Sequence, residues 1–198
     1  MRKRILCAQM IVLCLLLTAC GRGEKSNYDE LTLQIRSAYL AMEHCSATVD
    51  LTADYGERVY QYTLTLDSQK DGDLVLKVVK PDEVAGVTVR VKADSTALEY
   101  DGASLETGPL DDEGLSPISA PAVFLDQACE GYIAECGMET LDDTECLRVC
   151  YRAPDGEPGT GTESTLWFNT NTYAPVRGEI SSDGRCVVTC TFSEFTME

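Results

Sequence analysis

Two spacings of hydrophobic residues divide the chain into a short helical part and a long strand-rich part. Over residues 29–43 apolar side chains recur at helical spacing, and Asn27 or Asp29 could cap the start of this segment. After Cys45 the spacing changes to two, as expected for strands with one buried face. The pattern therefore predicts one amphipathic helix followed by a mainly β domain.

Eleven segments show the alternation of apolar and polar residues that is typical of strands. Turn signals such as Asp101-Gly102 and Asp183-Gly184 separate several of them. A second, short apolar helix is expected over residues 118–129, after an irregular proline-containing stretch that begins at Gly108. The expected strands cover residues 49–53, 60–67, 74–79, 87–92, 98–100, 104–106, 132–141, 145–153, 165–169, 176–181 and 186–195.

The order of these elements predicts the fold class. Strands that are joined by tight turns are antiparallel, and a long antiparallel sheet with one apolar face curls over whatever covers that face. The two helices are the only cover that the pattern offers. We therefore expect a mainly β (α+β) fold, with one strongly curved antiparallel sheet of about eleven strands. It forms an unclosed barrel with helices over its concave face, and residues 28–198 make a single domain.

The first twenty residues have the features of an export signal. Arg2, Lys3 and Arg4 precede a short apolar stretch, and the sequence Leu-Thr-Ala-Cys at 17–20 resembles the bacterial lipobox. This resemblance implies that residues 1–19 are a lipoprotein signal peptide and that Cys20 carries a lipid, with residues 20–27 as a flexible tether. The protein would then lie on the extracytoplasmic face of the cell membrane. The alternative is an ordinary secretory signal in which Cys20 has no special role.

Composition narrows the choice of partners. The chain has 33 acidic and 16 basic residues and a formal net charge of −17, whereas 44% of its residues are hydrophobic. Nucleic-acid binding and polybasic attachment to anionic lipids both need clustered Lys and Arg, so this balance argues against both. The hydrophobic content is sufficient for a sizeable core.

Few residues are candidates for catalysis or metal binding. His44 is the only histidine and adjoins Cys45, but neighbours on a helix point about 100° apart, so we expect a cation at a helix C-terminus rather than a catalytic pair. The acidic clusters at 111–113 and 142–143 are interpreted as solvated turns rather than calcium sites. The sequence predicts no catalytic residues, no metal site and no cofactor.

Seven cysteines remain after Cys7, Cys14 and Cys20 are set aside, so at least one thiol has no partner within the monomer. Residues four apart in a strand are ~13 Å apart, too far for a disulfide, but a hairpin at 142–143 could bring Cys136 close to Cys150. One to three disulfides, free buried thiols, or a redox or metal cluster all remain open. The seven are Cys45, Cys129, Cys136, Cys146, Cys150, Cys186 and Cys190.

Four aromatic residues are candidates for the wall of an apolar cavity, although an ordinary sheet core would contain them equally well. They are Tyr60, Tyr62, Trp167 and Phe168.

Several short motifs, in this order, resemble the lipoprotein-carrier superfamily that includes LolA and LolB. They are KPDEVAG at 80–86, LEYDG at 98–102, GLSP at 114–117, and LWFN at 166–169 with Pro175-Val176. The resemblance covers about residues 28–195. It implies an eleven-stranded unclosed barrel with a helical lid over an apolar cavity. Within the superfamily the sequence is most similar in style to GerS-like lipoproteins of Gram-positive Clostridia.

The resemblance implies a binding role rather than an enzymatic one. We expect a membrane-anchored, extracytoplasmic, non-catalytic module that binds a hydrophobic ligand (a lipid, an acyl chain or a lipoprotein) or an envelope protein. One alternative is a protein-partner scaffold in sporulation, germination or cell-wall processes. Another is a thiol redox or metal-binding secreted protein.

Overall fold

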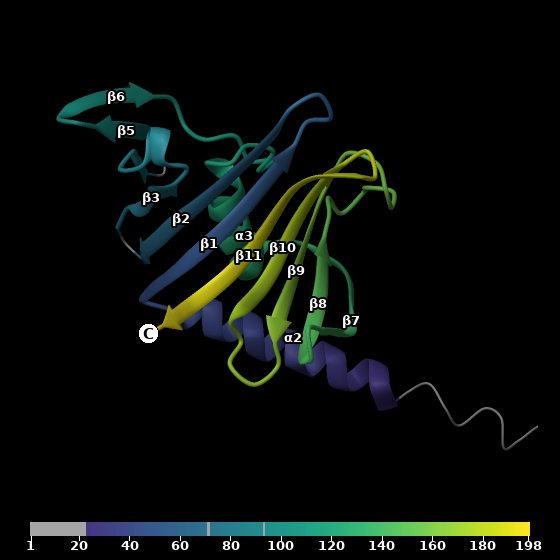
Figure 1. The fold of residues 1–198 in the computed structure, drawn as a ribbon. Helices are drawn as coiled ribbons and strands as arrows, with labels where there is room; N and C mark the ends of the chain where they lie inside the picture. Colours follow the sequence, from purple (N-terminus) through teal and green to yellow (C-terminus); the bar gives the residue numbers. More distant parts are fainter. Residues whose placement is uncertain (1–22, 71, 93) are drawn as a thin grey trace, which may run out of the picture.

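The chain folds around one continuous antiparallel sheet of eleven strands (Figure 1). The computed structural model describes residues 23–70, 72–92 and 94–198. In chain order the strands are β1 (His44–Asp54), β2 (Val59–Gln69), β3 (Leu74–Lys80), β4 (Thr88–Val91), β5 (Thr96–Tyr100), β6 (Ala103–Thr107), β7 (Ile133–Leu141), β8 (Thr144–Tyr151), β9 (Thr162–Asn169), β10 (Pro175–Ser182) and β11 (Arg185–Met197). All eleven predicted strands are confirmed.

The order of strands across the sheet is β6-β5-β4-β3-β2-β1-β11-β10-β9-β8-β7. Most neighbours are consecutive in the chain, whereas β1 pairs with β11 at the centre, with Leu51 opposite Cys190. Within the described residues, β6 and β7 each have one neighbouring strand, so the sheet has two free edges. The predicted unclosed barrel is therefore confirmed.

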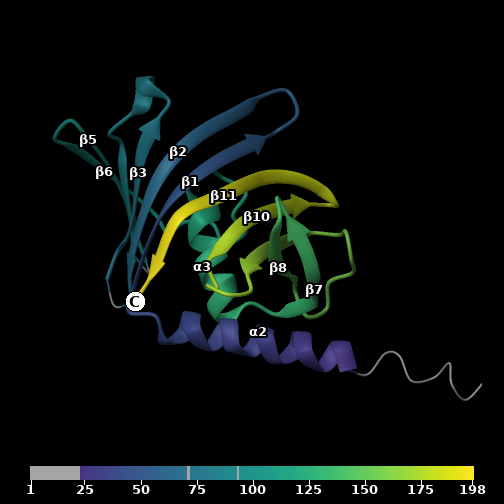
Figure 2. The ribbon, with the colours of Figure 1, turned by 60° about the horizontal axis from the view of Figure 1, so that its bottom comes forward.

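The helices occupy different places. Figure 2 shows α3 (Ser119–Glu130) inside the hollow of the sheet and α2 (Gly23–Ala41) across one end of it. A single turn of 3-10 helix, η1 (Asp82–Val84), follows β3. No helix within residues 23–70, 72–92 and 94–198 is long and apolar enough to cross a membrane.

The first helix differs from its predicted bounds. It begins at Gly23 rather than at residue 29, because the polar residues Glu24 and Lys25 are also good helix formers. Residues 23–27, which composition alone assigns to a flexible tether, are therefore helical. Cys20 and the predicted signal peptide at 1–19 lie outside the described residues.

The contact of α3 with the sheet depends on a glycine of β10, Gly178, which has no side chain. The ring of Phe124 lies on the backbone of β10 at Gly178, where an added Cβ would be 2.7 Å from the ring. Phe124 also meets Phe192 of β11 edge to face, with ring centroids 6.1 Å apart. Both phenylalanines are buried, so the glycine allows the helix to approach the sheet closely.

α2 is held to the rest of the domain by one face. Ile35 and Tyr39 are buried, and the Tyr39 ring lies 5.5 Å from that of Phe168. Arg36 donates a hydrogen bond to the carbonyl of Gly131, directly after the last residue of α3. A cation at a helix C-terminus is stabilised by the unpaired carbonyls and the helix dipole, so Arg36 links the two helices.

The close approach at Gly178 generates a stability prediction. We expect Gly178→Ala to lower the free energy of unfolding by about 1–3 kcal/mol, because the methyl group overlaps the buried Phe124 ring. Urea denaturation followed by circular dichroism measures the change. Gly137→Ala is the matched control, since no atom lies within 4 Å of the Cβ position there. An equal loss of stability in both variants would contradict the role assigned to Gly178.

Candidate functional site

An apolar pocket of about 380 Å³ opens on the concave side of the sheet. Its volume lies within the range of ~300–1,000 Å³ that is typical of small-ligand sites. None of its lining residues carries a charge. The lining residues come from β2 to β5, η1, the residue before β4 and the segment just before α3: Tyr62, Leu64, Leu76, Val78, Val84, Val87, Val89, Leu98, Ser116, Pro117 and Ile118.

Strand alternation explains the floor of the pocket. Leu76, Val89 and Leu98 lie opposite one another across β3, β4 and β5. Since every second residue of a strand points to the same face, the three side chains form an apolar row on the concave side. Leu64 and Val78 form the next pair of the same surface, across β2 and β3.

The pocket exists because α3 covers only part of the concave face. Through Phe124, α3 packs on β10 and β11. The helix begins at Ser119, and the pocket over β2 to β5 is lined on this side by the preceding residues 116–118. The remaining apolar surface is left as a hollow beside the N-terminal end of α3.

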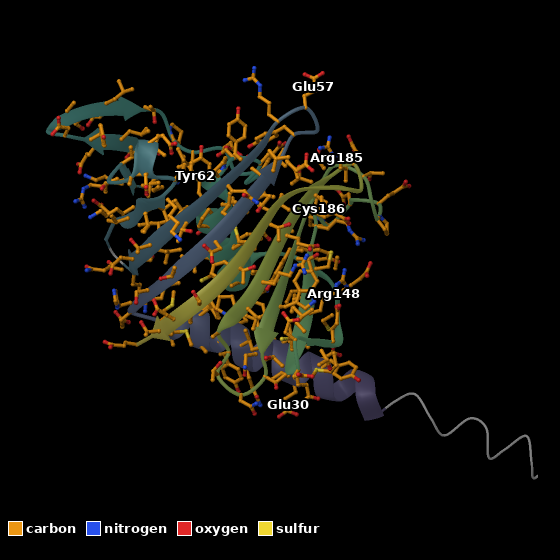
Figure 3. The ribbon with its side chains drawn as sticks, in the orientation of Figure 1. Glu30, Glu57, Tyr62, Arg148, Arg185 and Cys186 are labelled. Atoms are coloured by element: carbon orange, nitrogen blue, oxygen red, sulfur yellow. The ribbon has the colours of Figure 1, made fainter. Side chains whose placement is uncertain are left out.

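Aromatic residues surround the pocket on the β2 side. Tyr62 contributes to the wall (Figure 3), and Tyr60 is exposed on the same strand. The Tyr60 ring meets that of Tyr55 at a centroid distance of 6.0 Å, and the Tyr55 hydroxyl donates a hydrogen bond of 2.8 Å to the Leu115 carbonyl. This rim offers apolar rings together with phenol hydroxyls.

The four aromatic candidates from the sequence have three different roles. Tyr62 lines the pocket, and Tyr60 is exposed two residues away on the same face of β2, just outside the lining. Phe168 is a fully buried core residue against Tyr39. Trp167 lies on the opposite face of the sheet. Its ring is flanked by the guanidinium groups of Arg148 and Arg177 at 5.8 and 5.7 Å, and its Nε1–H donates to Glu139 over 2.9 Å.

Sequence reasoning did not identify most of the pocket wall. Val84, Val87 and Leu98 line it although none was singled out as a candidate. The alternation of valines at 87, 89 and 91 indicated a buried face, but an alternating pattern does not distinguish a filled face from an open one.

His44 is not at the end of a helix as predicted. The helix ends at Ala41, and His44 is the first residue of β1, where its Nε2 lies 3.0 Å from a carboxylate oxygen of Asp67 on β2. Cys45 is fully buried, whereas the His44–Asp67 pair is exposed, because successive strand residues point to opposite faces. The structure therefore does not bring His44 and Cys45 together as a nucleophilic pair.

The acidic clusters lie in turns, as predicted. Asp111 accepts a hydrogen bond from the Gly114 amide at 2.9 Å, and Asp142 and Asp143 form the β7–β8 turn with positive φ angles. The described part of the chain contains no group of three or more side chains suited to hold a metal ion.

A larger hollow of about 690 Å³ lies on the outer side of β1, β2 and β11. Its lining includes Asp50, Gln61, Lys80 and Asp82, so water solvates much of its wall. A ligand there would replace hydrogen bonds to water rather than bury apolar surface, which makes the smaller apolar pocket the better candidate site.

All seven cysteines of the described residues are free thiols. Cys136 lies opposite Val149 rather than Cys150, which pairs with Glu135, because the turn at Asp142 and Asp143 sets a register with Leu141 opposite Thr144 that continues unbroken to Glu135. The proposed Cys136–Cys150 pair is therefore not formed. Burial raises the pKa of Cys45 to about 11, and burial also raises the pKa of Cys190.

These environments predict the order of thiol reactivity. In the native protein at pH 8 we expect iodoacetamide to modify Cys186 first, since it is exposed at the β10–β11 hairpin (Figure 3). Cys45 and Cys190 should react only after unfolding in urea, because they are buried and protonated. Peptide mapping by mass spectrometry gives the extent of labelling at each site. Rapid labelling of Cys45 in the native protein would contradict the observed burial.

Comparison with known proteins supports the fold. No protein-family model matches the chain, and no curated protein matches its sequence. Among solved structures, an uncharacterized conserved protein from Thermus thermophilus is 10% identical, with a TM-score of 0.53 over 86% of this chain and 87% of that one. A DUF1329 family protein from Desulfovibrio piger is 14% identical, with a TM-score of 0.50 over 88% of this chain and 93% of that one.

A LolA superfamily protein from Nitrosomonas europaea is 12% identical, with a TM-score of 0.45 over 86% of this chain and 93% of that one. The fold itself shows the single curved sheet of eleven strands, with two free edges and a helix in its hollow, that the resemblance implies. The chain therefore has an open half-barrel fold, which it shares with the proteins from Thermus thermophilus and Desulfovibrio piger.

Proposed function

We propose that the protein is a membrane-anchored, extracytoplasmic binding module without catalytic activity, which holds a lipid or acyl chain in the apolar pocket of its half-barrel. The observation that supports this most directly is the uncharged lining of the pocket. Hydrocarbon is the ligand chemistry that gains most from such a wall, at ~0.8 kcal/mol for each buried methylene group.

The rim of the pocket suits the polar end of such a ligand. Ser116 lines the pocket, and the exposed Tyr60 lies beside Tyr55 at the rim. Hydroxyl groups donate and accept hydrogen bonds, so they can bind the ester or amide groups of a lipid whose chain lies in the pocket.

Anchoring would come from the lipid on Cys20. A single acyl chain gives only reversible membrane binding, whereas two or three chains hold a domain on a bilayer stably. The signal peptide at 1–19 would be removed, and the domain would then remain on the extracytoplasmic face of the cell membrane.

A second candidate function is binding of an envelope protein, as expected for a scaffold in sporulation, germination or cell-wall processes. The favouring observation is β6, whose five residues are all exposed and include Leu105 at 64%. Its free edge could pair with an added strand of a partner. The net charge of −17 would favour a basic partner.

Two exposed valines allow a direct test of the pocket. We expect Val84→Asp to weaken binding of a dansyl-labelled fatty acid at least tenfold, because the carboxylate lies at the apolar wall and would be desolvated by the bound chain. Fluorescence titration measures the dissociation constant.

Val79→Asp is the control for this substitution. Val79 and Val84 are 42% and 37% exposed, so the two substitutions should affect folding similarly. Only Val84 lines the pocket, so only Val84→Asp should weaken binding. Equal binding by both variants would overturn the assignment of the pocket. Failure of the unaltered protein to bind any acyl probe would favour the protein-partner function.

The anchor is tested separately. We expect Cys20→Ser to abolish incorporation of an alkyne-labelled palmitate in a lipoprotein-producing bacterial host and to move the protein out of the membrane fraction. The reason is that serine provides no thiol for thioether attachment. Retention in the membrane fraction without label would contradict lipidation at Cys20.

A further inference from the structure

The outward face of α2 exposes two large apolar side chains. Leu33 and Leu40 are 63% and 51% exposed, and they lie seven residues apart, which places them on the same side of a helix two turns apart. Ser37 lies between them and is also exposed. The opposite side of the helix contains the buried residues Ile35 and Tyr39 that attach it to the domain.

This face points away from the rest of the protein. Figure 2 shows α2 across the end of the half-barrel, with the strands and α3 on one side of it. Glu30, which is exposed, lies on the side of α2 away from the sheet in Figure 3. The leucine face is therefore not covered by any described part of the chain.

The length of chain before α2 limits what can cover this face. Gly23 is the first residue of the helix and is only three residues after Cys20. Three residues span at most ~11 Å when fully extended. If Cys20 carries the anchoring lipid, the start of α2 is held close to the bilayer surface, and the domain has no long tether on which to move away.

We propose that α2 lies flat on the bilayer that holds the Cys20 lipid, with Leu33 and Leu40 in contact with its acyl chains. This inference rests on the lipidation of Cys20, which is part of the proposed function. The lipid keeps the helix at a high effective concentration at the surface, so a contact formed by two leucines is sufficient even though it would be weak in an unattached protein.

The charges on α2 indicate which bilayer it suits. Asp29 and Glu30 are exposed at the start of this face, whereas Arg36 is directed to α3, where it bonds to Gly131. Lys and Arg side chains that would attract anionic headgroups are therefore not found on the exposed face of residues 28–41. The contact is apolar and should be favoured by neutral lipid.

Tryptophan substitution can report where the helix lies. The full lipidated protein is reconstituted into phosphatidylcholine vesicles with and without brominated acyl chains, which quench nearby tryptophan. We expect at least twofold quenching of the added fluorescence in Leu33→Trp and in Leu40→Trp. Leu105→Trp is the control, since Leu105 is 64% exposed on β6, and it should show no quenching. The unaltered protein supplies the background from Trp167.

Vesicle flotation is measured on the same samples and separates two kinds of failure. A protein that floats with the vesicles but shows no quenching at positions 33 and 40 overturns the flat helix and leaves the anchor intact. A protein that carries no lipid on Cys20 and does not float overturns both the anchor and this inference. A blue shift of the Leu33→Trp emission without vesicles, which increases with protein concentration, would show instead that a second copy covers the face.

Discussion

The constraint on which the structure depends is the need to cover one apolar face of a large antiparallel sheet. Eleven strands present alternate side chains to the concave side, and among the helices of residues 23–70, 72–92 and 94–198 α3 alone lies within that hollow. A twelve-residue helix is ~18 Å long, which is short compared with a sheet of this width. The surface over β2 to β5 retains an apolar hollow, whereas the hollow between α3 and the ends of β8 and β9 has charged residues such as Glu113 and Arg152 in its wall. The candidate site is thus the part of the core that the chain does not fill.

Much of this architecture could be predicted from residue patterns, because a strand with one buried face has a period of two. The alternation around Leu64 and Val89 placed both strands and indicated their buried faces correctly. Adjacent aromatic residues show the limit of the same rule. Trp167 and Phe168 must point to opposite faces, but the sequence does not reveal which of the two faces the core. The answer depends on the register across the whole sheet, which is a property of pairing between distant segments.

Other features depended on details that local patterns do not encode. The register that follows from Leu141 lying opposite Thr144 places Cys150 opposite Glu135 and not opposite Cys136. The start of α2 at Gly23 lies within a segment whose small and polar residues resemble a linker. In both cases the competing arrangements differ by one residue of register or by one turn of helix, and tertiary contacts determine the outcome.

The pairing of β1 with β11 has a consequence for how the protein reaches its folded state. The sheet has its first and its last strand side by side at the centre, so within the described sheet β11 links β1 to β6 with β7 to β10. A polypeptide that is synthesised from its N-terminus delivers β11 after all other strands. The two halves can therefore form hairpins of their own during synthesis, but the seam between them closes only when the last strand, of thirteen residues, has been made.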